Sequence, residues 1–239
     1  MANSIRGMKP VSDLAPARWV MESIPGFDFN VSSLVPECFA AYARILHPAR
    51  MGDEVNPRPV QWADVARANG RLLHPRAQFR KLVPPGHSEL ERGQPRFWDE
   101  TPRVGSLPSD VAQRLVEVLE KYTSTPQSCW FGIWDGYGDV DLAVAGFPTF
   151  TLPHRSYYLL RGPIEGMAQS VREPLFTQSP NLCWPDDRSW FVATEIDLDS
   201  TYLGASSECV RVLMRTPGLE VLQAAPTDGI TWDSDDLNP

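Results

Sequence analysis

Residues 179–201 read SPNLCWPDDRSWFVATEIDLDST and place two tryptophans, a run of acids and one arginine around a single predicted strand. Alternate side chains of a strand share a face, so residues 189–198 divide into two sets. One set is mainly apolar: Trp190, Val192, Thr194 and Ile196. The other begins apolar and ends acidic: Phe191, Ala193, Glu195 and Asp197. The pattern predicts a strand that packs its apolar side chains inward and gathers its carboxylates on one flank.

These carboxylates form a candidate metal site. If the strand continues, Asp199 joins Glu195 and Asp197 in one column, with neighbours about 7 Å apart. Like charges at that spacing repel unless water, an arginine or a cation lies between them. Oxygen clusters of this kind bind Mg²⁺ or Ca²⁺. The simpler interpretation is a half-exposed strand that turns its acidic end to water, and both interpretations stay open.

The WPDDR motif at residues 184–188 is a candidate binding turn. Pro185 favours a turn, and Asp186 and Asp187 after it are residues that bond nearby amides in turns. Arg188 carries a guanidinium that can fork onto a carboxylate. With Trp184 beside it, the motif fits either a structural turn or a ligand-binding turn.

The segment CWFGIW, residues 129–134, predicts a second strand with Trp130, Gly132 and Trp134 on one face. Two tryptophans beside a glycine can form a stacking platform for a ligand. The opposite face is also apolar, which is typical of a central strand covered on both sides. Trp130 and Trp134 are therefore candidate binding residues or core residues.

His154, in LPHRSYY, leads into another predicted strand and is the candidate catalytic histidine. The sequence contains no P-loop, H-E-x-x-H or G-x-S-x-G motif. The segment DGYGDVD, residues 135–141, departs from both the EF-hand loop and the G-x-G-x-x-G pattern. We therefore predict no cofactor and no assigned catalytic residue.

Periodicity and capping residues predict the other elements. Residues 36–46, 60–69, 75–82, 109–123 and 206–215 are the predicted helices, with Ser109 and Ser206 or Ser207 as N-caps. Residues 129–134, 141–146, 156–161, 189–198 and 219–224 are the predicted strands. Residues 228–239 hold four aspartates and no base, which predicts a frayed tail.

The order of these elements indicates an α+β fold, with a helical N-terminal region followed by a mainly antiparallel sheet with packed helices. The predicted division is a helical region at 12–83, a proline-rich connection at 84–108, an α+β sheet region at 109–226 and an acidic tail at 227–239. All four parts can also form one domain. Short spacing between the strands of 129–161 favours hairpins over crossover helices.

Composition excludes several classes of protein. The chain has 239 residues, 42% hydrophobic and 22% charged, which is ordinary for a globular protein and excludes disorder. It has no run of about 18 apolar residues, so no membrane span is expected. The first residues lack the apolar stretch of a signal peptide, so we expect a cytoplasmic protein.

Charge is distributed unevenly. Residues 44–81 hold eight Arg or Lys against three acids, whereas residues 173–239 hold twelve acids against three Arg. The net charges are therefore +5 and −9. Such asymmetry marks either two partner surfaces or two halves that attract each other. The overall charge of −8 disfavours nucleic acid as a partner and favours a basic protein.

Two stretches resemble uncharacterised proteins of high-GC bacteria. They are PGFDFNVSSLVPECFAAYARILHPAR, residues 25–50, and SPNLCWPDDRSWFVATEIDLDSTYLGAS, residues 179–206. The resemblance implies a bacterial lineage but no activity and no functional residue.

Two functions follow as hypotheses. The first is a non-catalytic cytosolic protein-binding module with an acidic, aromatic-rich C-terminal surface, such as an immunity-type inhibitor that binds a basic toxin. The second is a metal-assisted hydrolase or transferase in which Glu195, Asp197 and Asp199 hold a cation that activates water, with Asp186 and His154 as additional candidates.

Overall fold

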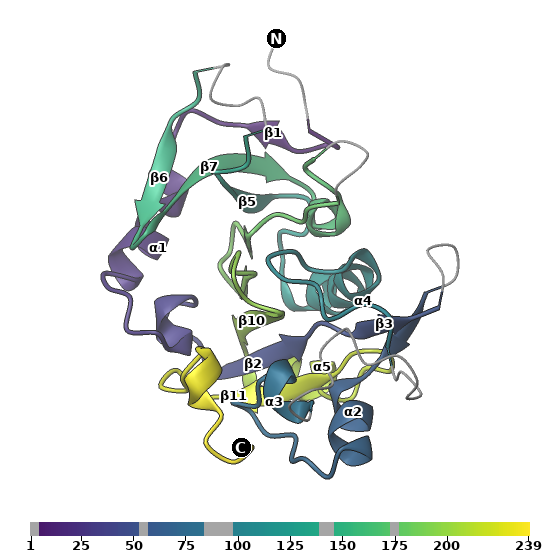
Figure 1. Cartoon of the computed structure of the whole chain (residues 1–239). Coiled ribbons are helices and arrows are strands. Elements are labelled where there is room, and N and C mark those ends of the chain that lie inside the picture. Colours follow the sequence, from purple (N-terminus) through teal and green to yellow (C-terminus); the bar gives the residue numbers. More distant parts are fainter. Residues whose placement is uncertain (1–4, 53–56, 84–97, 139–145, 173–176) are drawn as a thin grey trace.

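Antiparallel pairing joins strands from both ends of the chain in one sheet. A computed structural model describes residues 5–52, 57–83, 98–138, 146–172 and 177–239. Within these residues a nine-stranded sheet has the order β1-β7-β5-β8-β9-β10-β2-β11, and β6 also pairs with β7. Figure 1 shows the sheet curving from β6 and β7 down to β2 and β11. The mainly antiparallel α+β prediction is confirmed.

The strand bounds follow the chain. The sheet contains β1 Lys9–Pro10, β2 Ala41–Leu46, β5 Cys129–Trp134, β6 Thr149–Leu152, β7 Arg155–Gly162, β8 Leu182–Pro185, β9 Phe191–Ala193, β10 Ser200–Ala205 and β11 Val221–Ala224. A separate two-stranded ribbon pairs β3 Ala49–Met51 with β4 Arg58–Val60.

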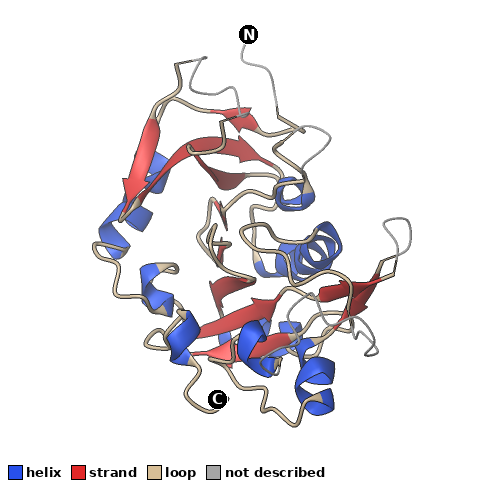
Figure 2. Ribbon diagram, viewed as in Figure 1, coloured by secondary structure: helices blue, strands red, loops and turns tan. Residues whose placement is uncertain are grey.

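Helices cover both faces of the sheet, as Figure 2 shows. The α-helices are α1 Arg18–Ser23, α2 Trp62–Ala68, α3 Phe79–Leu82, α4 Ser109–Leu119 and α5 Ser207–Leu213. The 3₁₀ turns are η1 Ala15–Ala17, η2 Val31–Ser33, η3 Glu120–Tyr122, η4 Ile164–Ala168 and η5 Trp232–Ser234. No helix of the described residues is long and apolar enough to span a bilayer.

Two apolar cores lie on opposite faces of the sheet. Helices α4 and α5 pack on one face with Phe131, Trp190 and Val192. Helix α1 and the turn η2 pack on the other face with Trp130 and Phe191. The predicted alternation is therefore confirmed over β5 and from Trp190 to Ala193. A third cluster packs α2 and α3 beneath the end of β2.

The predicted helix at 36–46 is wrong, because residues 41–46 form β2 between β10 and β11. This strand is covered on both faces: Tyr42 lies in one core, and Ala43 and Ile45 lie in the other. Apolar residues at successive positions produced a stripe that also fits a helix. A uniformly helical N-terminal region is accordingly not observed, since the described part of residues 12–83 contains three strands.

The strand predicted at 189–198 is too long, because β9 covers only Phe191–Ala193. After Ala193 the chain turns: the Asp197 N–H donates to Glu195 Oε2 at 2.5 Å, and the Leu198 N–H donates to the Glu195 carbonyl at 3.2 Å. A glutamate that bonds an amide two residues later competes with the sheet ladder. The expected column of three carboxylates does not form.

The other predicted elements have mixed outcomes. Helices 60–69, 109–123 and 206–215 are confirmed as α2, α4 with η3, and α5, although Pro108 replaces Ser109 as the N-cap of α4. Only 79–82 of the helix predicted at 75–82 is helical. Strands 129–134, 156–161 and 219–224 are confirmed. Residues 141–145 of another predicted strand, and 84–97 of the proline-rich connection, lie outside the described residues.

The tail predicted to fray is instead packed. Asp235 has no exposed surface, and Ile230 and Asn238 are also buried. Asp235 lies 2.8 Å from His74, and Arg76 pairs with Asp236. The prediction is wrong because the basic segment near residue 75 supplies partners for these aspartates, which a local sequence pattern does not show.

Candidate functional site

A cleft of about 360 Å³ opens on the face of the sheet covered by α1 and η2. This volume lies within the range of small-ligand pockets. Its floor is apolar and is formed by Leu34, Leu152, Leu182, Ala193 and Leu198. Chain segments distant in sequence therefore meet around one hollow.

An aromatic wall borders this floor. Phe27 lies edge-on to Phe29, with ring centroids 5.1 Å apart, and edge-on to His154 at 5.6 Å. Phe29 is 58% exposed, which is unusual for a phenylalanine and leaves its ring open to a partner. Tyr157 also lines the cleft, and burial raises the pKa of its hydroxyl.

Two residues of this wall have left-handed backbone conformations. Phe29 has a φ of 57° and His154 a φ of 68°. Side chains with a Cβ pay a cost of about 1–2 kcal/mol in this region. His154 follows Pro153 in the two-residue hairpin between β6 and β7, where glycine or asparagine is the usual choice. Strained residues gather at functional sites, and here two of them border the same cleft.

Arg155 neutralises part of the acidic rim of the cleft, which is formed by Glu195 and Asp197. The Arg155 Nε donates to Glu195 Oε1 at 3.1 Å, and its Nη2 donates to Asp197 Oδ2 at 2.7 Å. The Glu195 side chain is 9% exposed, whereas that of Asp197 is 74% exposed. Two carboxylates against one guanidinium leave a net charge of −1 on the lining, and the accessible part of that charge lies on Asp197.

The structure brings together His154, Glu195 and Asp197, three of the predicted site residues, but not Asp199. Asp199 faces the buried Arg44 guanidinium, with Oδ1 and Nη2 3.8 Å apart. Burial raises the pKa of Asp199, and the nearby Arg44 opposes that rise. Among the described residues, no three His, Cys, Asp or Glu side chains converge to hold a metal ion.

The WPDDR turn has a structural role. Asp187 accepts hydrogen bonds from the Ser124 N–H at 2.7 Å and from the Ser124 and Thr123 hydroxyls. Burial acts to raise the pKa of Asp187, but the hydrogen bonds from Ser124 and Ser189 lower it to about 2. Asp186 accepts the Trp130 indole N–H at 2.7 Å. The turn therefore fastens the end of β8 to the segment that follows η3.

The predicted aromatic binding residues are mainly core residues. Trp184 is 1% exposed and stacks on Phe191, with ring centroids 5.6 Å apart. Trp130 is also buried, beneath the Arg161 guanidinium. Arg188 has a left-handed backbone and lies over Trp19. Trp134 is half-buried, and its ring lies 5.9 Å from the Arg155 guanidinium beside the cleft.

Sequence reasoning missed Phe27, Phe29 and Arg155. The motif PGFDFN did contain a signal for the two phenylalanines. It is rich in turn residues and has no helix or strand periodicity that would place both rings in a core. Arg155 gave no such signal, since its partners Glu195 and Asp197 lie 40 residues or more away. No family model, curated protein or solved structure matches this chain.

Proposed function

We propose that the protein is a non-catalytic protein-binding module that recognises a basic partner through the cleft. The observation that carries this proposal is the juxtaposition of an exposed aromatic ring, Phe29, with an acidic rim in which two carboxylates share one arginine. The chain as a whole carries a charge of −8, which attracts basic partners and accelerates their encounter. An immunity-type inhibitor of a basic toxin would use such a surface.

The geometry supports a two-part mode of recognition. An apolar side chain of the partner fills the floor between Phe29 and Leu198, where it is removed from water. A lysine or arginine next to it pairs with Asp197, whose carboxylate is mostly exposed. The same cation can also lie against the face of an aromatic ring of the wall. Apolar burial thus supplies affinity, and the carboxylate supplies selection for positive charge.

Binding of a minimal basic ligand tests this mode. The probe is an acetylated, amidated tetrapeptide with the sequence Phe-Lys-Phe-Lys, compared with Phe-Glu-Phe-Glu, in a calorimetric or fluorescence titration at low and high salt. We expect the lysine peptide to bind more tightly than the glutamate peptide. Salt should reduce that preference, because it screens exposed charges.

Variants locate the binding. Phe29→Gly should weaken binding of the lysine peptide by about fivefold or more, and should leave folding intact because glycine tolerates the left-handed backbone. Val104→Ala, a change at a similarly exposed apolar residue outside the cleft, is its control. Asp197→Asn should reduce the preference for lysine, whereas Asp64→Asn, at another exposed aspartate paired with an arginine, should not. Equal binding of both peptides, or equal effects of test and control variants, would refute the proposal.

The metal-assisted enzyme has less support from the geometry. Arg155 already occupies the two carboxylates of the cleft that a cation would need, and Asp199 lies with Arg44 instead. A cation at Glu195 and Asp197 would have to displace the guanidinium and then bind only two carboxylates, fewer than the oxygen ligands that Mg²⁺ or Ca²⁺ requires. The binding module is therefore the function that we propose.

A further inference from the structure

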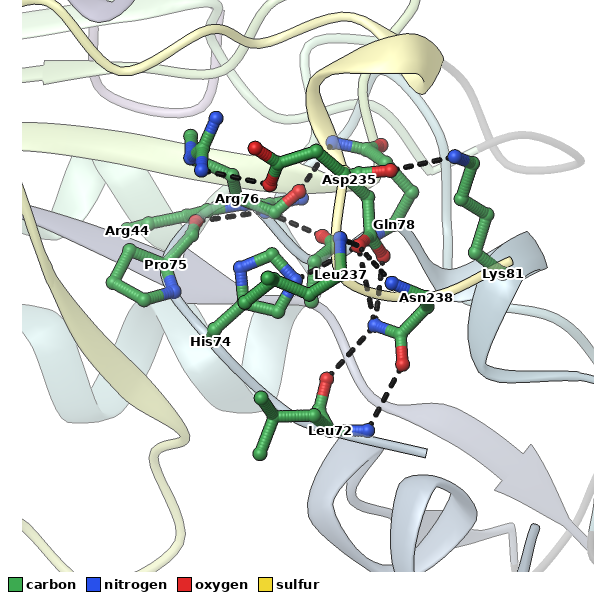
Figure 3. A network of polar contacts seen from close by, with 12 residues as sticks. Arg44, Leu72, His74, Pro75, Arg76, Gln78, Lys81, Asp235, Leu237 and Asn238 are labelled. Atoms are coloured by element: carbon green, nitrogen blue, oxygen red, sulfur yellow. Dashed lines mark hydrogen bonds and ion pairs between the residues drawn. The ribbon is translucent and has the colours of Figure 1, made fainter. Parts of the chain in front are cut away.

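A clasp around Asp235 and Asn238 holds the C-terminal segment, and Asp235 forms its first point (Figure 3). The His74 Nε2 donates to Asp235 Oδ1 at 2.8 Å, and the Gln78 N–H donates to Oδ2 at 3.1 Å. The Lys81 ammonium donates to the Asp235 carbonyl at 2.5 Å. Asp235 has no exposed surface, so its carboxylate depends on donors such as His74 and Gln78. The clasp therefore fastens the segment to the N-terminal half of the chain.

Asn238 forms the second point of the clasp. Its Oδ1 accepts the Leu72 N–H and its Nδ2 donates to the Leu72 carbonyl, both at 2.9 Å. The Asn238 N–H and Nδ2 also donate to Asp235. Burial acts to raise the pKa of Asp235, but the bonds from Asn238, Gln78 and His74 lower it to about 2, so the carboxylate stays charged. With the Leu237 N–H, five N–H donors thus converge on one buried anion.

The same segment builds one wall of the cleft. Ile230 and Thr231 line the cleft, and Ile230 is 3% exposed. The Ile230 N–H donates to the Phe29 carbonyl at 3.0 Å, and the Val31 N–H donates to the Asp228 carbonyl at 3.0 Å. The segment therefore also fixes the backbone at the strained Phe29 and just after it.

A short, capped turn connects the wall to the clasp. The turn η5 covers Trp232–Ser234, and Thr231 and Ser234 close a capping box across it. Asp235 follows directly, so only this one 3₁₀ turn separates Thr231 from the clasp. The wall and the clasp are therefore separated by a single capped turn.

We propose that the clasp at Asp235 and Asn238 is a strap that regulates the cleft: closed, it holds Ile230 and Phe29 in the binding geometry, and open, it releases that wall. The regulated activity rests on the proposed binding function. When the strap is open, binding of the partner has to order the wall again. The free energy spent on this ordering lowers the affinity of the cleft for the partner.

Asp235→Asn tests the strap, with Asp236→Asn as the matched control. Every neighbour of the Asp235 carboxylate is a donor, so an amide NH₂ at this position faces donors and loosens the clasp. Asp236 is an exposed neighbour paired with Arg76, and its change removes the same charge without touching the clasp. Asn238→Ala, which removes the bonds to Leu72, is the milder variant if Asp235→Asn fails to fold.

Hydrogen exchange and peptide affinity are the two measurements. We expect Asp235→Asn to accelerate exchange of the Ile230 and Val31 amides and to weaken binding of the Phe-Lys-Phe-Lys peptide by about fivefold or more. Asp236→Asn should change neither. Unchanged exchange at Val31 in both Asp235→Asn and Asn238→Ala, or faster exchange with unchanged affinity, would overturn the strap. If the wild-type chain binds no peptide, the binding function fails, and the exchange of Val31 alone decides whether the clasp holds the wall.

Discussion

At the scale of single residues, Glu220 places a helix that is distant in sequence. Its Oε2 accepts the Trp62 N–H at 2.6 Å and its Oε1 accepts the Ala63 N–H at 2.8 Å, at the start of α2. The local N-cap, Gln61, makes no side-chain bond, so Glu220 supplies the cap from elsewhere in the chain. Burial raises the pKa of this carboxyl, and the two amide bonds oppose the rise.

Replacing this carboxylate should destabilise the protein. Glu220→Ala leaves two amides at the start of α2 without acceptors, and we expect the free energy of unfolding to fall by about 1–2 kcal/mol. Urea denaturation measures the change. Glu117→Ala, at an exposed position of α4, should change stability by less than about 0.5 kcal/mol. An equal, small effect of both variants would show that Glu220 does not act as a cap.

Part of the candidate site was predictable from single residues, but its assembly was not. His154, Glu195 and Asp197 are chemical groups that a sequence shows, and they do line one cleft. Their common partner Arg155, and the aromatic wall of Phe27 and Phe29, depend on long-range packing. Asp199 departed from the predicted group because the chain turns at Glu195, and a sequence pattern with a period of two does not contain that turn.

At the scale of elements, the amphipathic helices α4 and α5 were predictable, whereas the doubly covered strands β2 and β10 were not. Helix α4 has a polar face and an apolar face, so its periodicity identified it. Strand β10 is buried along its whole length, and β2 nearly so, and neither produced an alternating pattern. Arg44 interrupts the apolar run of β2 and connects the strand to the segment at 75–77.

This arginine should be essential to the packing of β2. Its Nη1 donates to the Ala77 carbonyl at 2.6 Å and to the Pro75 carbonyl at 3.1 Å, and its Nε donates to Ser200 Oγ at 2.9 Å. Arg44→Met leaves these acceptors without a donor and should lower the free energy of unfolding by about 3 kcal/mol.

Denaturant titration of Arg44→Met against Arg67→Met checks this expectation. Arg67 forms an exposed pair with Asp64 on α2, so its replacement should cost less than about 1 kcal/mol. Comparable losses in the two variants would mean that the buried bonds of Arg44 contribute no more than a surface ion pair.

At the scale of the whole molecule, the two oppositely charged halves meet each other. The sequence shows a basic segment at residues 44–81 and an acidic one at 173–239. This charge asymmetry left open whether the two segments face other proteins or each other. The clasp of His74, Lys81 and Asp235, and the pair of Arg76 with Asp236, use part of both charges internally. The acidic charge that stays accessible at the cleft is that of Asp197. A sequence gives the total charge of each half, but the fold decides which groups remain open to a partner.

The most direct measurement is a ¹H–¹⁵N NMR titration of the wild-type chain with the Phe-Lys-Phe-Lys peptide. We expect the amide shifts to concentrate at Phe29, His154, Glu195 and Ile230, and the Phe-Glu-Phe-Glu peptide to cause smaller shifts at the same sites. Shifts that are absent from these amides, or that gather at the exposed apolar residues of α5 and its end, Val212 and Met214, would contradict it.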